Sequence, residues 1–217
     1  MFKWPTLVVL IFVVCSGAIG TVGTRAAAQE SASDAAALEG FRSAKFGMDQ
    51  DAVRAAIKDD FGAEGDRVAS GRNTIERTNV LTLLVPDLLS EGGTAQVSYV
   101  FGYTTDTLIQ VGVSWSAETD PALTDEDFLS NGEVLRAFFV GAGYDPDTVI
   151  VDSPVENGII LFRGSDLTGR TALLLLQGAF IETAEGQPPA LLPSGLALLY
   201  SVSPDNPDVF QIEEGEF

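Results

Sequence analysis

Residues 96–115 read QVSYVFGYTTDTLIQVGVSW, and apolar side chains recur at every second position on both sides of a polar turn. A period of two is typical of an antiparallel sheet that buries one face and exposes the other. The turn Thr104–Asp106 predicts that the two strands form a hairpin. The side chains expected on the buried face are Val97, Tyr99, Phe101 and Tyr103 in the first strand and Ile109, Val111, Val113 and Trp115 in the second.

A helix is predicted before this hairpin, at residues 49–61. Asp49 is suited to cap the free amides of its first turn, and Gly62 is suited to end it. Between the helix and the hairpin, residues 80–85 predict a further strand. This order, a helix followed by strands, defines a first unit at residues 41–118. The apolar side chains that recur on one face of the helix are Val53, Ile57 and Phe61.

The same order is predicted again after the polar segment 116–124, which contains Pro121. Thr124 and Asp127 form a capping-box signal for a second helix. Strands are then expected at residues 148–151, 159–162, 171–177 and 196–202. The sequence therefore predicts an α+β fold of two tandem helix-plus-antiparallel-sheet units packed together, the second at residues 119–217. The side chains expected on the apolar face of the second helix are Val134, Leu135, Phe138 and Phe139.

Two strands of the second unit are apolar on both faces. They are Ile159–Phe162 and Leu173–Leu176. Alternate side chains of a strand point to opposite faces, so one set belongs to the core of the second unit and the other set needs separate cover. Two readings are open. The second set is buried between the two halves of the chain, or it forms a groove for a partner or an apolar ligand.

The first 28 residues have the pattern of a secretory signal peptide. Lys3 precedes an apolar run at Leu7–Val14, and small residues at Ala26–Ala28 precede Gln29. The run is shorter than the roughly 20 apolar residues of a membrane-spanning helix. We therefore expect a signal peptide at 1–28, a flexible tether at 29–40, and a periplasmic or secreted protein. Lipidation of Cys15 is the alternative, but Val14 is larger than the residue that usually precedes a lipidated cysteine.

The net charge of the chain limits the kinds of partner that it can bind. The 217 residues include 12 basic and 31 acidic side chains, a formal net charge of −19. Cleavage after Ala28 removes Lys3 and Arg25 and brings the charge to −21. Such a surface repels phosphate backbones and anionic headgroups, so we expect no nucleic-acid partner and no integral membrane segment after cleavage. The acidity serves solubility, or it attracts a basic protein partner.

The amino-acid composition also limits the catalytic and metal-binding sites that the chain can form. Cleavage removes the only cysteine, and the chain has no histidine, so thiol chemistry and histidine-based zinc or triad sites are absent. Three alternatives remain, and local structural roles explain each of them better. They are paired carboxylates for glycoside hydrolysis, a calcium site at Asp125–Glu133 or Asp205–Asp208, and a Ser43–Lys45 dyad. The sequence predicts no enzyme, no catalytic residue, no cofactor and no bound metal.

Gly47 and Met48, with Val53 and Ile57 at the following spacing, are similar to the helix start of the SmpA/OmlA family of small envelope proteins. The resemblance covers about residues 41–116 and extends to the β-lactamase-inhibitor-protein architecture, in which two helix-plus-sheet units stand in tandem. Family members end the helix soon after the position of Ile57, whereas Lys58–Phe61 continue it here. The resemblance implies a non-catalytic, protein-binding role and carries no individual site residue.

These patterns together predict an exported, soluble, non-enzymatic interaction or scaffold protein of the bacterial cell envelope, whose partner is another envelope protein. The alternative is a carrier that holds an apolar small molecule or lipid in a groove of the second unit. A contiguous apolar cavity favours the carrier, and a solid core with an exposed apolar strip favours the scaffold.

Overall fold

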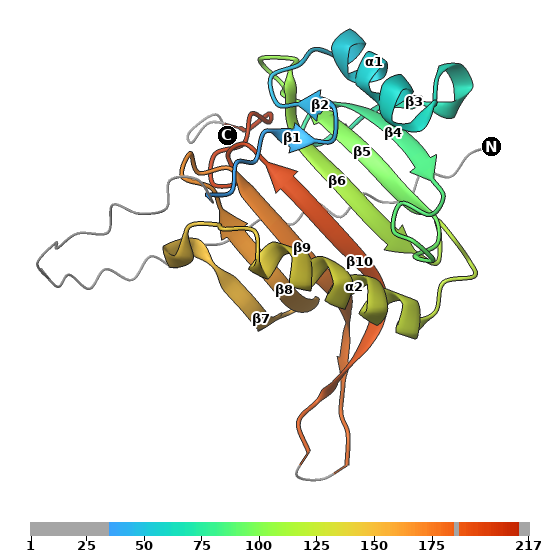
Figure 1. Ribbon diagram of the computed structural model, residues 1–217, viewed down its shortest axis with the longest axis vertical. Helices are drawn as coiled ribbons and strands as arrows, with labels where there is room; N and C mark the ends of the chain where they lie inside the picture. Colours follow the sequence, from blue (N-terminus) through green and yellow to red (C-terminus); the bar gives the residue numbers. More distant parts are fainter. Residues whose placement is uncertain (1–34, 185–186, 213–217) are drawn as a thin grey trace, which may run out of the picture.

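The computed structural model describes residues 35–184 and 187–212. The predicted signal peptide lies outside the described residues, as does the first half of the predicted tether, residues 29–34. The described chain forms one eight-stranded antiparallel sheet, a two-stranded hairpin and two α-helices (Figure 1). This confirms the predicted α+β class.

Each half of the chain contributes one helix and four strands of the large sheet. The first half also carries the small hairpin, β1 (Gly40–Phe41) and β2 (Ala44–Lys45). Its remaining elements are α1 (Gln50–Phe61), a 3-10 turn (Gly65–Arg67), β3 (Ala69–Arg72), β4 (Asn79–Val85), β5 (Ala95–Phe101) and β6 (Leu108–Ser116). The second half has α2 (Asp125–Val140), a 3-10 turn (Pro146–Thr148), β7 (Ile150–Val155), β8 (Gly158–Ser165), β9 (Thr171–Ile181) and β10 (Ala190–Ser201).

The two halves join edge to edge. The strand order is β3-β4-β5-β6-β10-β9-β8-β7, so the last strand of one half pairs with the last strand of the other. In this antiparallel pair Trp115 lies opposite Leu196 and Val113 opposite Leu198. The two units are therefore one continuous sheet, and the first unit's strands extend the second unit's strands sideways. They do not lie over the second unit's sheet as cover.

The first helix forms as predicted. The Asp49 carboxylate accepts a hydrogen bond from the Ala52 amide at 2.8 Å, and Gly62 ends α1 in the left-handed conformation that glycine adopts without strain. Val53 and Ile57 are fully buried against the sheet, whereas Phe61 is half-buried at its edge. Local capping and a 3.6-residue apolar period were sufficient to place this element.

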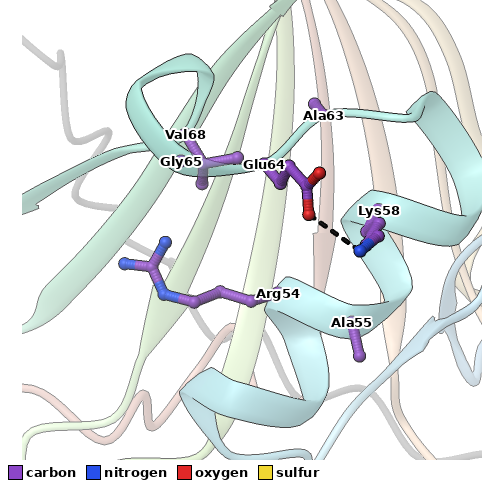
Figure 2. A pocket seen from close by; sticks show the side chains of 7 residues that line it. All are labelled: Arg54, Ala55, Lys58, Ala63, Glu64, Gly65 and Val68. Atoms are coloured by element: carbon purple, nitrogen blue, oxygen red, sulfur yellow. Dashed lines mark ion pairs between the residues drawn. The ribbon is translucent and has the colours of Figure 1, made fainter.

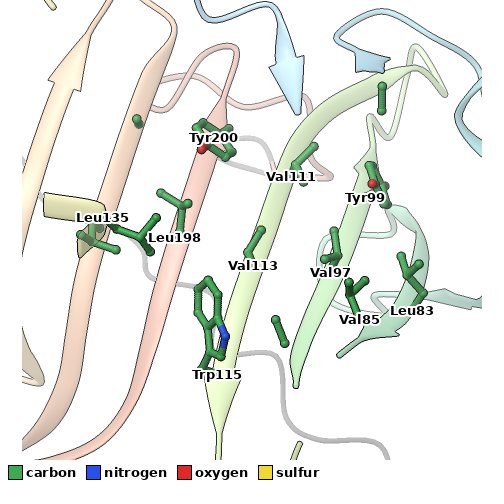
Figure 3. Close-up of a cluster of buried hydrophobic side chains, with 14 of the residues drawn as sticks. Leu83, Val85, Val97, Tyr99, Val111, Val113, Trp115, Leu135, Leu198 and Tyr200 are labelled. Carbon is green, nitrogen blue, oxygen red and sulfur yellow. The ribbon is translucent and has the colours of Figure 1, made fainter. Parts of the chain in front are cut away.

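The main core lies between the sheet and the helices. Trp115 points into it, as strand phase predicts, and a row of side chains from both halves continues across the β6–β10 junction (Figure 3). Tyr103 is an exception to the predicted row, because β5 ends at Phe101 and the Tyr103 side chain is exposed. The row comprises Leu83 and Val85 from β4, Val97 and Tyr99 from β5, Val111, Val113 and Trp115 from β6, and Leu198 and Tyr200 from β10.

The second helix begins as predicted but buries a different face. Thr124 and Asp127 exchange both hydrogen bonds of a capping box. Leu135 and Phe139 are buried as expected, but Val134 and Phe138 are exposed, Phe138 at 66 %. The reason is the close contact at Gly132, where a Cβ would come within 2.7 Å of the Leu161 side chain. This small residue brings the helix close to the sheet and turns the face 128–132–135–139 inward.

The end of the predicted tether packs against the folded body. Residues 35–40 were expected within a tether, but Leu38 is buried and its amide donates to the Asp166 carboxylate at 3.0 Å. The Arg170 guanidinium donates to the Leu38 carbonyl at 3.1 Å. Asp166 also accepts from the Thr168 and Arg170 amides. Burial alone would raise the pKa of Asp166, but the hydrogen bonds from Thr168, Leu38 and Arg170 outweigh it and lower the pKa.

Candidate interaction surface

The second apolar set of the two-faced strands is already covered. Leu175 is 2 % exposed and Leu173 is 6 % exposed, on the face opposite the helices. They pack with Ile160 and with the partly buried Val155 and Leu199. Of the two interpretations left open for residues 159–162 and 173–176, burial fits these positions and an exposed groove does not, although the first half's sheet is not the cover. Both faces of the strands are buried within the body of the sheet.

The hollow on that face is small. It has a volume of about 20 Å³ and is lined by Arg163, Thr171, Leu173, Leu199, Ser201, Pro204 and Asp205. A volume of this size holds about one water molecule. Drug-sized ligands occupy pockets of roughly 300–1,000 Å³, so this hollow has no room for a lipid or a comparable apolar molecule.

A larger open hollow, of about 230 Å³, lies between α1 and the chain that follows it (Figure 2). Its lining is partly charged, and its cations already have partners. The Lys58 ammonium lies 2.8 Å from the Glu64 carboxylate, and the Arg54 guanidinium donates to the Ser70 hydroxyl. The Glu64 carboxylate neutralises the charge of Lys58, whereas the neutral Ser70 hydroxyl orients the Arg54 guanidinium without cancelling its charge.

Local structural roles occupy the polar residues that the sequence singled out for possible chemistry. The Ser43 hydroxyl donates to Asp60 at 2.7 Å, while Lys45 lies 3.5 Å from Glu39, so the two do not form a dyad. Within residues 35–184 and 187–212, no group of three or more potential metal-binding side chains converges. No helix in the same ranges is long and apolar enough to cross a bilayer.

The Asp205–Asp208 segment is not the simple solvated turn that the sequence suggested. The Asp208 carboxylate accepts hydrogen bonds from the Thr104 and Thr105 amides and from the Thr105 hydroxyl, at 2.7–3.0 Å. Burial acts to raise the pKa of Asp208, but these bonds outweigh it and lower the pKa. The chain after β10 thus crosses back and fastens the β5–β6 turn, more than one hundred residues away in sequence.

One apolar feature extends outside the body. Beyond Gln177 and Gly195 the strands β9 and β10 leave the sheet and pair only with each other among the described residues. We call residues 178–193 the arm; the structure describes 178–184 and 187–193 of it. Figure 1 shows the arm projecting past α2. Its strand residues are Gly178, Ala179, Phe180 and Ile181 on β9 and Ala190, Leu191, Leu192 and Pro193 on β10.

The arm strands are apolar on both faces. Register places Phe180 opposite Leu191 on one face, and Ile181 opposite Ala190 on the other with Leu192 beside them. Phe180 is 39 % exposed, Ile181 46 % and Leu192 50 %. A two-stranded ribbon is only marginally stable by itself in water, and a clustered apolar surface of this kind marks an interaction site more often than chance.

Three glutamates lie on the arm or close to its base. Glu182 directly follows β9, and Glu156 lies in the turn whose Asn157 carbonyl accepts from the Gly178 amide at 3.0 Å. Glu118 lies two residues beyond Ser116, which pairs with Gly195 at the base of the arm. No lysine or arginine follows Arg170 in the sequence. The arm itself therefore carries no cation, and three glutamates lie on it or next to its base.

The sequence prediction ended the strand at Gln177 and began the next at Leu196, so it missed the arm. Gly178, Pro193 and Gly195 have the pattern of strand breakers. The signal that could have identified the arm is the pair of apolar runs at 178–181 and 190–193, placed symmetrically around a polar tip. Recognising the pair requires knowing that the two runs face each other.

None of the family models, curated proteins and solved structures compared with the chain matches it.

Proposed function

We propose that this protein is an exported, non-enzymatic interaction or scaffold protein of the bacterial cell envelope, and that its arm contacts the partner. The observation that carries the proposal is the arm's exposed apolar surface, formed by Phe180, Ile181 and Leu192 outside the core. Burying these side chains against a partner would gain about 25 cal/mol per Å² of apolar surface removed from water. The free protein keeps that surface exposed, which is the pattern of a surface used in binding.

Other observations support a binding role over a carrier role. The helix-covered side of the sheet is filled by side chains such as Trp115 and Leu196, which leave almost no exposed surface. The hollow beside Leu173 holds about one water molecule. Export is proposed from the signal pattern at residues 1–28, and the resemblance of residues 41–116 to the SmpA/OmlA family implies the same setting.

The proposed partner is another envelope protein that presents basic side chains around an apolar strip. Glu118, Glu156 and Glu182 lie on the arm or next to its base, and the formal net charge of the chain is −19 before cleavage. Opposite charge at the rim of an interface speeds association and selects the partner, while apolar burial at its centre supplies most of the affinity.

Site-specific photo-crosslinking in intact cells tests this proposal. A photoreactive residue replaces Leu192 on the arm in one strain and Leu84 on β4 in another. The two leucines are matched in exposure, 50 % and 54 %, and β4 lies three strands from β10 in the sheet. We expect one dominant adduct from position 192 and none of that mass from position 84. Equal adducts from both positions, or none from position 192, would contradict the proposal.

A further inference from the structure

The two outer edges of the arm differ in the backbone groups that they present. In a strand the amide and carbonyl of alternate residues point to the same edge. The Gly178 amide points away from β10, because it donates to the Asn157 carbonyl. The backbone groups of Phe180 therefore also point outward, whereas those of Ala179 and Ile181 point toward β10.

The β10 edge of the arm lacks donors. Pro193 lies opposite Gly178 and Leu191 lies opposite Phe180, so both residues present their backbone to the outer edge. Pro189 directly precedes the strand. Proline has no amide hydrogen, and Leu191 is thus the only one of these three positions with a donor. This pattern blocks strand pairing along β10, as edge prolines do in many sheets.

The β9 edge keeps its donors and acceptors. Its neighbour β8 pairs with β9 only as far as Gly158 opposite Gln177, and within the described residues no strand continues beside Phe180. The exposed positions 178–182 contain no proline. One edge of the arm is therefore closed to pairing and the other is open.

We infer that an extended segment of the partner adds to the arm as a strand along the β9 edge, in line with β8. The Phe180 amide and carbonyl supply the main-chain hydrogen bonds, and the arm's apolar side chains lie beside those of the added strand. Glu156 and Glu182 lie near the two ends of this edge, so the added segment carries lysine or arginine beside its apolar residues. This inference rests on the proposed function of the arm and assigns the mode of binding and the chemistry of the partner segment.

A second copy of the chain is a poorer occupant. The formal net charge of −21 after cleavage opposes self-association, and the glutamates around one arm would face those around the other. Self-pairing through the β9 edge is therefore an outcome of the test that would overturn the inferred partner chemistry.

The probe is a fluorescent synthetic peptide of alternating valine and threonine with two lysines at each end, and its binding is followed by fluorescence anisotropy. A matched peptide has glutamate in place of lysine. Phe180→Pro removes the outward amide while leaving the inward bonds of Ala179 and Ile181 in place. Phe180→Ala removes the same side chain but keeps the amide. Near-ultraviolet circular dichroism and thermal melting confirm that both variants are folded.

We expect the lysine peptide to bind the wild type and the glutamate peptide to bind at least tenfold more weakly. Phe180→Ala should weaken binding only partly, and Phe180→Pro should weaken it about tenfold further through the lost hydrogen bond. Hydrogen exchange at the Phe180 amide should slow when the peptide is added.

Equal losses in the two variants, with no slowing of exchange, would overturn strand addition while leaving the arm as a side-chain docking surface. Absence of peptide binding to the wild type would overturn the inferred segment chemistry, and the crosslinking at Leu192 would still decide the arm's function separately. Concentration-dependent dimers in sedimentation, abolished by Phe180→Pro, would show that the occupant is a second copy.

Discussion

A substitution at Leu175 tests whether the strands of the second half are buried on both faces. The side chain is 2 % exposed and packs in the small cluster with Ile160, Leu173, Val155 and Leu199, opposite the helices. Leu175→Ala removes three carbons, one methine and two methyl groups, worth about 0.8 kcal/mol each in transfer free energy. The cavity adds to this cost, and buried leucine-to-alanine changes cost about 2–5 kcal/mol in total. Because the cluster is small and able to collapse partly, we expect about 3 kcal/mol.

The assay is thermal unfolding of the purified protein, combined with a denaturant titration at neutral pH. For a chain of this size, 3 kcal/mol corresponds to a fall in Tm of roughly 6–12 °C. Leu192→Ala is the matched control, because Leu192 lies on the adjoining strand but is 50 % exposed on the arm. It should cost less than about 1 kcal/mol. A wild-type Tm for Leu175→Ala would refute the burial of this face and restore the groove.

Three further substitutions test the packing of α1 and two clasps, the long-range contacts in which Asp166 holds Leu38 and Asp208 holds the β5–β6 turn. Ile57→Ala should lower the free energy of unfolding by about 2–5 kcal/mol in denaturant titration, since Ile57 is fully buried; a smaller loss would mean that α1 packs loosely. Asp166→Asn should destabilise the protein at neutral pH. The difference in stability between wild type and variant should vanish as pH falls through the folded-state pKa of Asp166, which is lowered below the ordinary 3.8. A stability difference that does not change with pH would exclude the carboxylate as the cause. Gly102→Ala places a Cβ against the Asp208 carboxylate, whereas at Gly112 the nearest atom lies 3.8 Å away. Limited proteolysis should therefore cut residues 203–210 faster in Gly102→Ala than in Gly112→Ala, and equal rates would refute the clasp.

Elements with local signals were predictable from the sequence. The caps at Asp49 and Thr124, the alternation up to Trp115 and the stop at Gly62 each depend on residues within one helix turn or one strand. The structure places both caps, the stop at Gly62 and the inward Trp115 as predicted, whereas Tyr103 lies outside the alternation. The order of one helix followed by strands, repeated once, follows from the same short-range patterns.

Features that depend on distant contacts were not predictable. The buried face of α2 is selected by the fit of Gly132 over Leu161, and apolar periodicity alone favoured Phe138 as well as Phe139. The clasps of Leu38 on Asp166 and of Asp208 on Thr105 join positions more than one hundred residues apart. The edge-to-edge junction of β6 and β10 has no sequence signature either, because strand pairing is decided by the whole sheet.

The candidate surface was the least predictable feature. The apolar runs at 173–176 attracted attention because they are long, yet the sheet buries them. The runs at 178–181 and 190–193 include a glycine and a proline, yet the register carries them past the edge of the body. Exposure depends on where a strand's neighbours end, and one strand's sequence does not contain that information.

The most direct measurement of the central claim is hydroxyl-radical footprinting of Phe180, Ile181 and Leu192, in the purified protein and in intact cell envelopes. The exposed Leu84 on β4 is the internal reference. If the arm is the interaction surface, the three arm side chains are oxidised readily in the purified protein and protected in the envelope, while Leu84 is oxidised equally in both. Equal oxidation of the arm in both states would contradict the account.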